Sequence, residues 1–268
     1  GTIAGLLKDG SQAKQGGAYT SAQLPVEALV PTSKHRIISE QIAQIDSKNM
    51  SFDVWEKLHK RISVAQNDPA IHAIVITHGT DTMEETAYFL HRTLVCSKPV
   101  ILTGAMRPAD AVDSDGSKNI AFALEQAKAL GAGVWVVFAD QVFSGDNVRK
   151  AHPTRLDAFE AMADNFVADG SPVAFHLPIK RWPRVEVVMS YAGADGAIVD
   201  ALIALRVDGI VVVGTGNSTI HDALQAMLDK ACEAGIAVSL TTRCVTGSTE
   251  NKNAIQARID LILALLSR

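Results

Sequence analysis

The sequence predicts an α/β protein with two domains. Apolar runs rich in β-branched residues alternate with segments of helical periodicity over most of the 268 residues. Such alternation is typical of a parallel sheet covered by helices on both faces. We expect a larger N-terminal domain at 1–177 with a parallel or mixed sheet and flanking helices, a linker at 178–183, and a smaller flavodoxin-like α/β domain at 184–268.

The strands and helices follow from the spacing of apolar residues. Six strands are expected, at Ile71–Thr77, Pro99–Thr103, Val134–Phe138, Val185–Met189, Gly209–Val213 and Ile236–Leu240. Four helices are expected, and their apolar faces contain Met83, Ala87, Leu90 and Leu94; Ile120, Leu124, Ala127 and Leu130; Ile220, Leu224, Met227 and Ala231; and residues of the closing segment Ala254 to Leu266. Two prolines and three basic residues interrupt this alternation within 175–183, which is why the domain boundary is placed there.

Composition excludes several classes of function. The net charge of −4 argues against binding of nucleic acid, which needs a basic face. No apolar run reaches the roughly 18 residues of a membrane span. Cys96, Cys232 and Cys244 lack the CxxC spacing of a metal site, so they are interpreted as small core residues. The segment Gly214–Thr219 lacks the third glycine of a dinucleotide fingerprint. We therefore expect no metal and no cofactor.

The segment Thr77–Thr86 contains hydroxyl and carboxylate side chains at the end of a predicted strand. Thr80, Asp81 and Thr82 lie where the apolar run 74–76 ends and a helix begins, and ligands of open α/β sheets bind beyond such strand ends. One interpretation is structural: Asp81 or Thr82 caps the helix, and Thr82 with Glu85 forms a capping box. That interpretation leaves the hydroxyl of Thr80 unexplained. A threonine hydroxyl becomes a good nucleophile only when a base or a cation assists it.

Three further residues could serve that hydroxyl chemistry. Lys150 follows the strand Val134–Phe138, and it is either a buried partner of Thr80 and Asp81 or a solvated lysine in a loop. Thr2 lies between two glycines in Gly1–Gly5, which allows a sharp turn. That turn looks like one that follows a strand outside this sequence. Tyr19 ends a Gly- and Lys-rich stretch that is typical of a lid loop.

Together these residues resemble the bacterial-type L-asparaginases, which are threonine amidohydrolases. The resemblance extends from residue 1 to the final helix. It depends on three motifs, Gly-Thr-Ile-Ala-Gly at 1–5, Ile-Thr-His-Gly-Thr-Asp-Thr-Met-Glu-Glu-Thr at 76–86 and Gly-Ala-Met-Arg-Pro at 104–108. It implies hydrolysis of L-asparagine to L-aspartate and ammonia through a threonine acyl-enzyme, with a minor activity on L-glutamine.

The resemblance also implies roles for individual residues. Thr2 is the expected nucleophile and Tyr19 the lid residue that polarises it, while Thr80, Asp81 and Lys150 form a second catalytic group. The substrate would be bound by Ser47 at its α-carboxylate, by Asp81 at its α-ammonium and by the backbone of Ala105 at its amide. The implied substrate-binding residues are Ser47, Lys48, Gly79, Thr80, Asp81 and Ala105, and the implied contributions from a neighbouring subunit are Asn217, Thr219 and Glu250.

The implied assembly is a homotetramer, a dimer of dimers with active sites at subunit interfaces. The expected compartment is the cytoplasm or the periplasm, with the cytoplasm favoured because no signal peptide and no clear disulfide pair are visible. Two departures from the family pattern are Lys48, where relatives often have Gln or Glu, and Ser218, where they often have Gly. Two other functions fit the same fold, a non-catalytic amino-acid sensor and an ammonia-releasing amidotransferase subunit.

Overall fold

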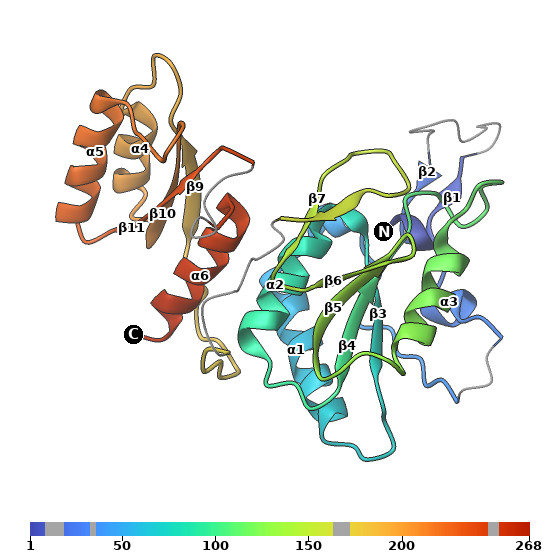
Figure 1. The fold of residues 1–268 in the computed structure, drawn as a ribbon. Helices are drawn as coiled ribbons and strands as arrows, with labels where there is room; N and C mark the ends of the chain where they lie inside the picture. The colour runs from blue at the N-terminus through green and yellow to red at the C-terminus, as the bar shows by residue number, and fades with distance from the viewer. Residues whose placement is uncertain (9–18, 33–35, 163–171, 246–251) are drawn as a thin grey trace. The chain divides into compact units, whose positions relative to one another are not determined.

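The computed structural model describes residues 1–8, 19–32, 36–162, 172–245 and 252–268. The chain forms two compact units, residues 1–161 and 162–268, each with its own sheet (Figure 1). The predicted α/β class is confirmed, with a mixed sheet in the N-terminal unit and a parallel sheet in the C-terminal unit. In the described part of the chain, no helix combines the length and apolarity that a bilayer crossing needs.

The N-terminal sheet has the order β3-β4-β5-β6. Its first three strands are parallel, and the fourth returns antiparallel at the edge. The bounds of these strands are Ile74–Thr77 for β3, Pro99–Thr103 for β4, Gly133–Phe138 for β5 and Gln141–Ser144 for β6. The prediction of β4 is confirmed residue for residue. The predicted start of β3 at Ile71 is wrong, because Asp68 holds the chain in a turn by accepting from the N–H groups of Ala70 and Ile71.

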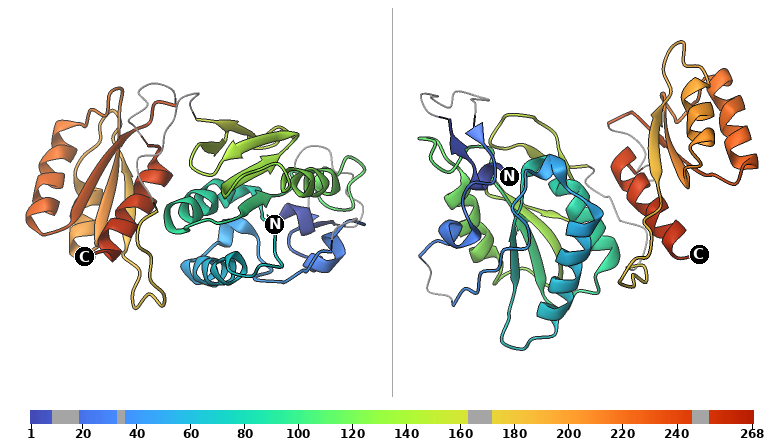
Figure 2. Two further views of the ribbon diagram at one scale, coloured as in Figure 1. Left: turned by 60° about the horizontal axis from the view of Figure 1, so that its bottom comes forward. Right: turned by 180° about the vertical axis from the view of Figure 1, so that it is seen from behind.

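Helices cover both faces of this sheet (Figures 1 and 2). Helix α3 packs on one face through a cluster that includes Ile101, Ala123 and Val137. On α2, the expected apolar face is confirmed, because Met83, Ala87, Leu90 and Leu94 are all buried. The bounds are Phe52–Gln66 for α1, Met83–Thr93 for α2 and Gly116–Gln126 for α3. Helix α1 was not predicted.

Shorter elements surround the carboxyl ends of these strands. They are the 3₁₀ turns η1 (Thr2–Ala4), η2 (Val26–Leu29), η3 (Ser47–Asn49) and η4 (Thr80–Thr82), the hairpin of β1 (Leu6–Leu7) with β2 (Tyr19–Thr20), and the hairpin of β7 (Val148–Lys150) with β8 (Phe159–Ala161). None of these strands was predicted, because each is only two or three residues long. Such lengths are too short for an alternating pattern to be recognised.

The C-terminal sheet has the order β11-β10-β9, with all strands parallel. Helices α4 and α5 pack on one face and α6 on the other (Figure 2). The bounds are Val185–Met189 for β9, Ala197–Ala204 for α4, Gly209–Gly214 for β10, Asp222–Glu233 for α5, Ala237–Thr242 for β11 and Ala254–Leu266 for α6. The predicted core position of two cysteines is wrong: Cys232 and Cys244 are exposed. Cys232 follows buried Ala231 on α5, and one helical step turns it towards solvent.

Candidate active site

The candidate residues of the N-terminal unit meet beyond the carboxyl ends of β3 and β4. The chain leaves β3 at His78, whose N–H still donates to the carbonyl of Thr103 at 2.8 Å, and then passes through Gly79 into η4. Packing around Gly79 is tight. A Cβ atom at Gly79 would lie 2.4 Å from Ser47 Oγ, and one at Gly1 would lie 2.3 Å from Gly79 Cα. Three segments distant in sequence therefore touch at this position, and only glycine fits there.

Thr2 and Tyr19 form the first pair of hydroxyl groups. Thr2 Oγ1 and Tyr19 Oη lie 2.9 Å apart, within hydrogen-bond distance. The short pairing of β1 with β2 places them together, since Leu7 opposes Tyr19 across it. The stretch expected to form a lid, residues 9–18, lies outside the described residues. A phenol this close to a threonine hydroxyl can accept a hydrogen bond from it or donate one to its oxygen.

Thr80, Asp81 and Lys150 form the second group. Lys150 Nζ donates to Thr80 Oγ1 at 2.8 Å and to Asp81 Oδ1 at 2.6 Å. The Lys150 side chain is only 15% exposed, so its interpretation as a solvated loop lysine is wrong. It is the last residue of β7, which brings it to the end of β3. The Asp81 side chain remains 55% exposed, which leaves part of the carboxylate accessible to a cationic ligand.

Thr82 is the N-cap residue of helix α2, as one interpretation of this segment has it. The hydroxyl of Thr82 makes no capping bond to helix α2 and donates instead to the carbonyl oxygen of Ser47 at 2.8 Å. Ser47 Oγ accepts from the N–H of Asp81 at 3.3 Å. The polar groups that would cap an isolated helix thus hold η3 against η4. The side chain of the neighbouring Lys48 is 66% exposed, and its Nζ lies 3.6 Å from Asp46 Oδ2.

A buried carboxylate holds the turn that contains Ala105. Asp115 accepts from the backbone N–H groups of Met106 and Arg107 at 2.9–3.1 Å. Asn119 donates both to Asp115, at 3.2 Å, and to the carbonyl of Gly104, at 2.9 Å. Ala105 itself is fully buried beside the turn η1. Sequence reasoning assigned no role to Asp115 or Asn119, although an acid four residues before an amide at a helix start is a pattern that could have revealed them.

His78 lies behind the site in a buried chain of hydrogen bonds. Its Nδ1 lies 2.6 Å from the carbonyl oxygen of Gly79, and its Nε2 lies 3.0 Å from the hydroxyl of Thr86. That hydroxyl also accepts from Trp55 Nε1 at 2.9 Å. Burial lowers the pKa of His78 to about 4, so the imidazole is neutral near pH 7. A neutral ring protonated at Nδ1 donates to the carbonyl of Gly79 and accepts from the hydroxyl of Thr86. Each group in this series of hydrogen bonds then has a partner.

The remaining candidates belong to the C-terminal unit, apart from Glu250, which lies outside the described residues. Asn217 and Thr219 are exposed in the turn after β10. That turn is closed by Thr215 and Thr219, whose backbones exchange two hydrogen bonds of 2.8 Å. Ser218, at φ +60°, adopts the left-handed conformation that glycine adopts without strain.

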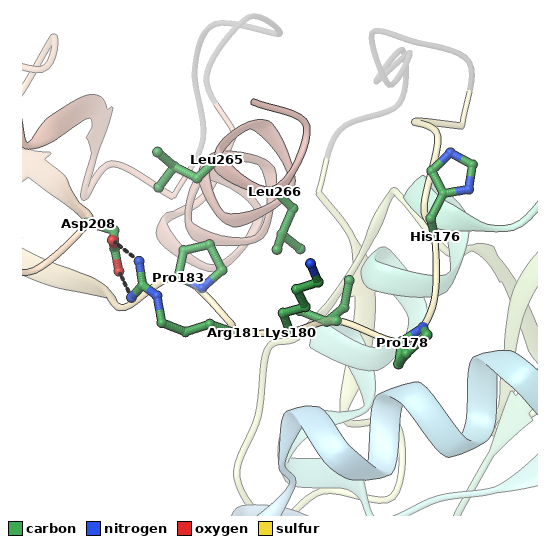
Figure 3. Close-up of a pocket in the computed structure, with 9 residues that line it drawn as sticks. His176, Pro178, Lys180, Arg181, Pro183, Asp208, Leu265 and Leu266 are labelled. Atoms are coloured by element: carbon green, nitrogen blue, oxygen red, sulfur yellow. Dashed lines mark hydrogen bonds and ion pairs between the residues drawn. The ribbon is translucent and has the colours of Figure 1, made fainter.

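This unit also contains a cavity of about 420 Å³ (Figure 3). Lys180, Pro183, Asp208 and Leu266 are among the residues that line it, and Arg181 binds Asp208 through two hydrogen bonds of 2.7 and 2.8 Å. Among the candidate site residues that the structure describes, none lines this cavity.

The fold defines an α/β protein whose polar groups gather at the carboxyl ends of the parallel strands, where ligands of open α/β sheets bind. Two family models match the chain, "Asparaginase, N-terminal" over residues 1–178 and "Glutaminase/Asparaginase C-terminal domain" over residues 184–265. Together they span nearly the whole sequence. The chain belongs to the L-asparaginase family of hydrolases.

Individual relatives agree with this assignment. The chain is 31% identical to L-asparaginase 2 of Bacillus subtilis, over 99% of this chain and 80% of the relative. It is 30% identical to the glutaminase-asparaginase of Pseudomonas fluorescens, over 96% of this chain and 76% of the relative. Among solved structures it is similar to one described as a probable cytoplasmic L-asparaginase from Campylobacter jejuni. That match has a TM-score of 0.86 at 33% identity, over 100% of this chain and 93% of the other.

Proposed function

We propose that this protein hydrolyses the side-chain amide of L-asparagine to L-aspartate and ammonia, with L-glutamine as a minor substrate. The observation that carries the proposal is the half-buried Lys150, bonded to both Thr80 and Asp81 near the carboxyl end of β3. A lysine held against a hydroxyl group and a carboxylate can move a proton to or from that hydroxyl. The printed names of the relatives, L-asparaginase and glutaminase-asparaginase, support the choice of substrate.

In the first step, Thr2 Oγ1 attacks the amide carbon of the substrate. Tyr19, 2.9 Å away, accepts a hydrogen bond from this hydroxyl and orients its proton towards the leaving nitrogen. The C–N bond breaks, the proton leaves with ammonia, and an ester joins Thr2 to the aspartyl group. Fixed N–H donors near the strand ends stabilise the oxyanion that forms in between.

In the second step, water hydrolyses this ester. Lys150 takes a proton from the attacking water through Thr80, and the water oxygen bonds to the ester carbon. The C–O bond to Thr2 then breaks and this proton passes to Thr2 Oγ1, which releases L-aspartate and restores the threonine hydroxyl. Asp81 holds the ammonium form of Lys150 and, through its exposed surface, the α-ammonium of the substrate. Ser47 binds the α-carboxylate, Ala105 contacts the amide through its backbone, and Gly79 and Lys48 complete the substrate pocket.

We further propose a cytoplasmic homotetramer in which Asn217, Thr219 and Glu250 of one subunit contribute to the site of another. The printed description of the Campylobacter jejuni relative as cytoplasmic supports the compartment. Cell fractionation tests the compartment, and light scattering of the purified protein tests the assembly. A monomer with full activity would refute the shared site.

Ammonia release from L-asparagine and L-glutamine tests the chemistry. We expect Thr2→Ala and Thr80→Ala each to lower kcat by at least about 10³-fold, as removal of a nucleophile or its activating group does. Wild-type rates in both variants would eliminate the threonine mechanism. Stoichiometric binding of asparagine without turnover in the wild-type protein would favour the sensor, whereas ammonia release only with a tRNA-linked acceptor would favour the amidotransferase subunit.

A further inference from the structure

A glutamate that the mechanism above does not use lies next to the lysine. Glu84 occupies the first turn of α2, and its Oε2 accepts from the backbone N–H of Lys150 at 2.6 Å. Glu84 follows Asp81 by three residues and Thr80 by four. A single turn of chain therefore binds Lys150 at both ends, its backbone through Glu84 and its ammonium through Thr80 and Asp81.

We propose that Glu84 is a positioning residue for the catalytic lysine, fixing the backbone of Lys150 so that Nζ lies between Thr80 Oγ1 and Asp81 Oδ1. The inference rests on the proposed function, which assigns proton transfer to Lys150. A lysine ammonium lies at the end of a flexible four-carbon stem, so its position depends on where the backbone of the residue is held. Here that backbone is the end of a three-residue strand, which a single hairpin partner, β8, holds in place.

Other contacts of the hairpin join its own two strands. Within β7, Arg149 binds Glu160 on β8 at 2.8 Å, which ties the two strands to each other. The hydrogen bond from Lys150 to Glu84 ties the hairpin backbone to the same turn as Thr80 and Asp81. A displacement of about 1 Å in a catalytic group can cost about 100-fold in rate, so loss of this anchor should lower kcat.

The environment of Glu84 gives the proposal a pH signature. Burial raises the pKa of Glu84, and the neighbouring Glu85 raises it further. The N–H of Lys150 and the charges of Arg149 and Lys150 oppose this, without cancelling the effect of burial. Glu84 therefore gains a proton at a higher pH than an ordinary glutamate and then becomes a weaker acceptor for the lysine N–H. Part of the acid limb of kcat should belong to this group.

The experiment compares Glu84→Ala, Glu84→Gln and the matched control Glu85→Gln in the full-length protein. Ammonia release gives kcat and KM from pH 4 to 9, and a thermal melt reports folding. We expect Glu84→Ala to lower kcat by about 10-fold or more while KM changes by less than about threefold. Glu84→Gln retains an amide oxygen as acceptor, so it should restore most of kcat, with an acid limb displaced from that of the wild type. Glu85→Gln should match the wild-type kcat near pH 7.5.

Each outcome supports or overturns the inference. A wild-type kcat in Glu84→Ala overturns it, as does a loss of activity that follows the folded fraction alone. If Glu84→Ala does not fold, Glu84→Gln decides, and an acid limb unchanged from the wild type overturns the proposal. The variant Lys150→Met tests the proposed function independently of Glu84. Wild-type activity in Lys150→Met refutes the proposed role of the lysine in proton transfer. An inactive Lys150→Met beside a fully active Glu84→Ala refutes only the role of Glu84.

Discussion

Replacing Gly79 with alanine tests the packing of the candidate site. The added Cβ would meet Ser47 Oγ at 2.4 Å, Ser47 Cβ at 2.7 Å and Gly1 Cα at 3.1 Å. Real Cβ contacts are essentially never under 3.0 Å, so Ser47 must move. Because Ser47 also bonds Asp81 and Thr82 across η3 and η4, the displacement strains both turns. Overpacking of this kind costs about 1–3 kcal/mol in the free energy of unfolding.

The same displacement should weaken substrate binding. If Ser47 binds the α-carboxylate of the substrate, loss of that charge-assisted hydrogen bond costs about 1.5–3 kcal/mol. The KM for L-asparagine should therefore rise by about 10- to 150-fold in Gly79→Ala. Initial-rate kinetics of ammonia release measure KM, and urea unfolding measures stability.

Gly131→Ala is the matched control. No atom lies within 4 Å of its added Cβ, and Gly131 is exposed. We expect an unchanged KM and a stability within about 1 kcal/mol of the wild type. Unchanged KM and stability in Gly79→Ala as well would refute the argument from packing.

Two further predictions concern buried groups around the site. Asp115→Ala leaves the N–H groups of Met106 and Arg107 without their acceptor, so urea unfolding should show a free energy of unfolding lower by about 2–5 kcal/mol. The control Asp113→Ala removes an exposed carboxylate and should lower it by less than about 1 kcal/mol. His78 has a pKa of about 4 in the folded protein and about 6.5 when unfolded. The unfolded state binds the proton first, so stability should fall by about 3 kcal/mol as pH drops from 6.5 to 4, and a wild-type pH dependence in His78→Asn would contradict this.

Much of the fold could be predicted from local pattern. Long apolar strands and helices with a clear buried face were found, and β4 and α6 agree with their predicted bounds. The predicted start of β3 was wrong because a polar contact from Asp68 overrides the apolar pattern there. The hairpin of β7 and β8 escaped prediction because its short strands are ordered by pairing with each other, which no local sequence signal records.

In the candidate site, too, some residues could be predicted from sequence and others were recognised only in the structure. Local sequence placed Thr80 and Asp81 at the end of a strand. It also offered Lys150, Thr2 and Tyr19 as candidates, and the family resemblance then assigned their roles and added Ser47. The capping signal gave the right N-cap residue for α2, Thr82, but its hydroxyl bonds a segment 35 residues earlier in the chain and not the helix. Glu84 and Asp115 were not recognised, because both act on backbone N–H groups, and every segment of sequence has those.

The sequence by itself determined the α/β class, the apolar faces of the main helices and the chemical groups available at the end of β3. These properties depend on residue type and on spacing over a few positions, so they can be predicted from the sequence alone. Only the tertiary structure decided that Lys150 is half-buried between Thr80 and Asp81, that Ser47 touches Gly79, and that Glu84 holds the lysine backbone. Those contacts join residues 32 to 70 positions apart, and their distances depend on how the turns η3 and η4 and the strand β7 pack together.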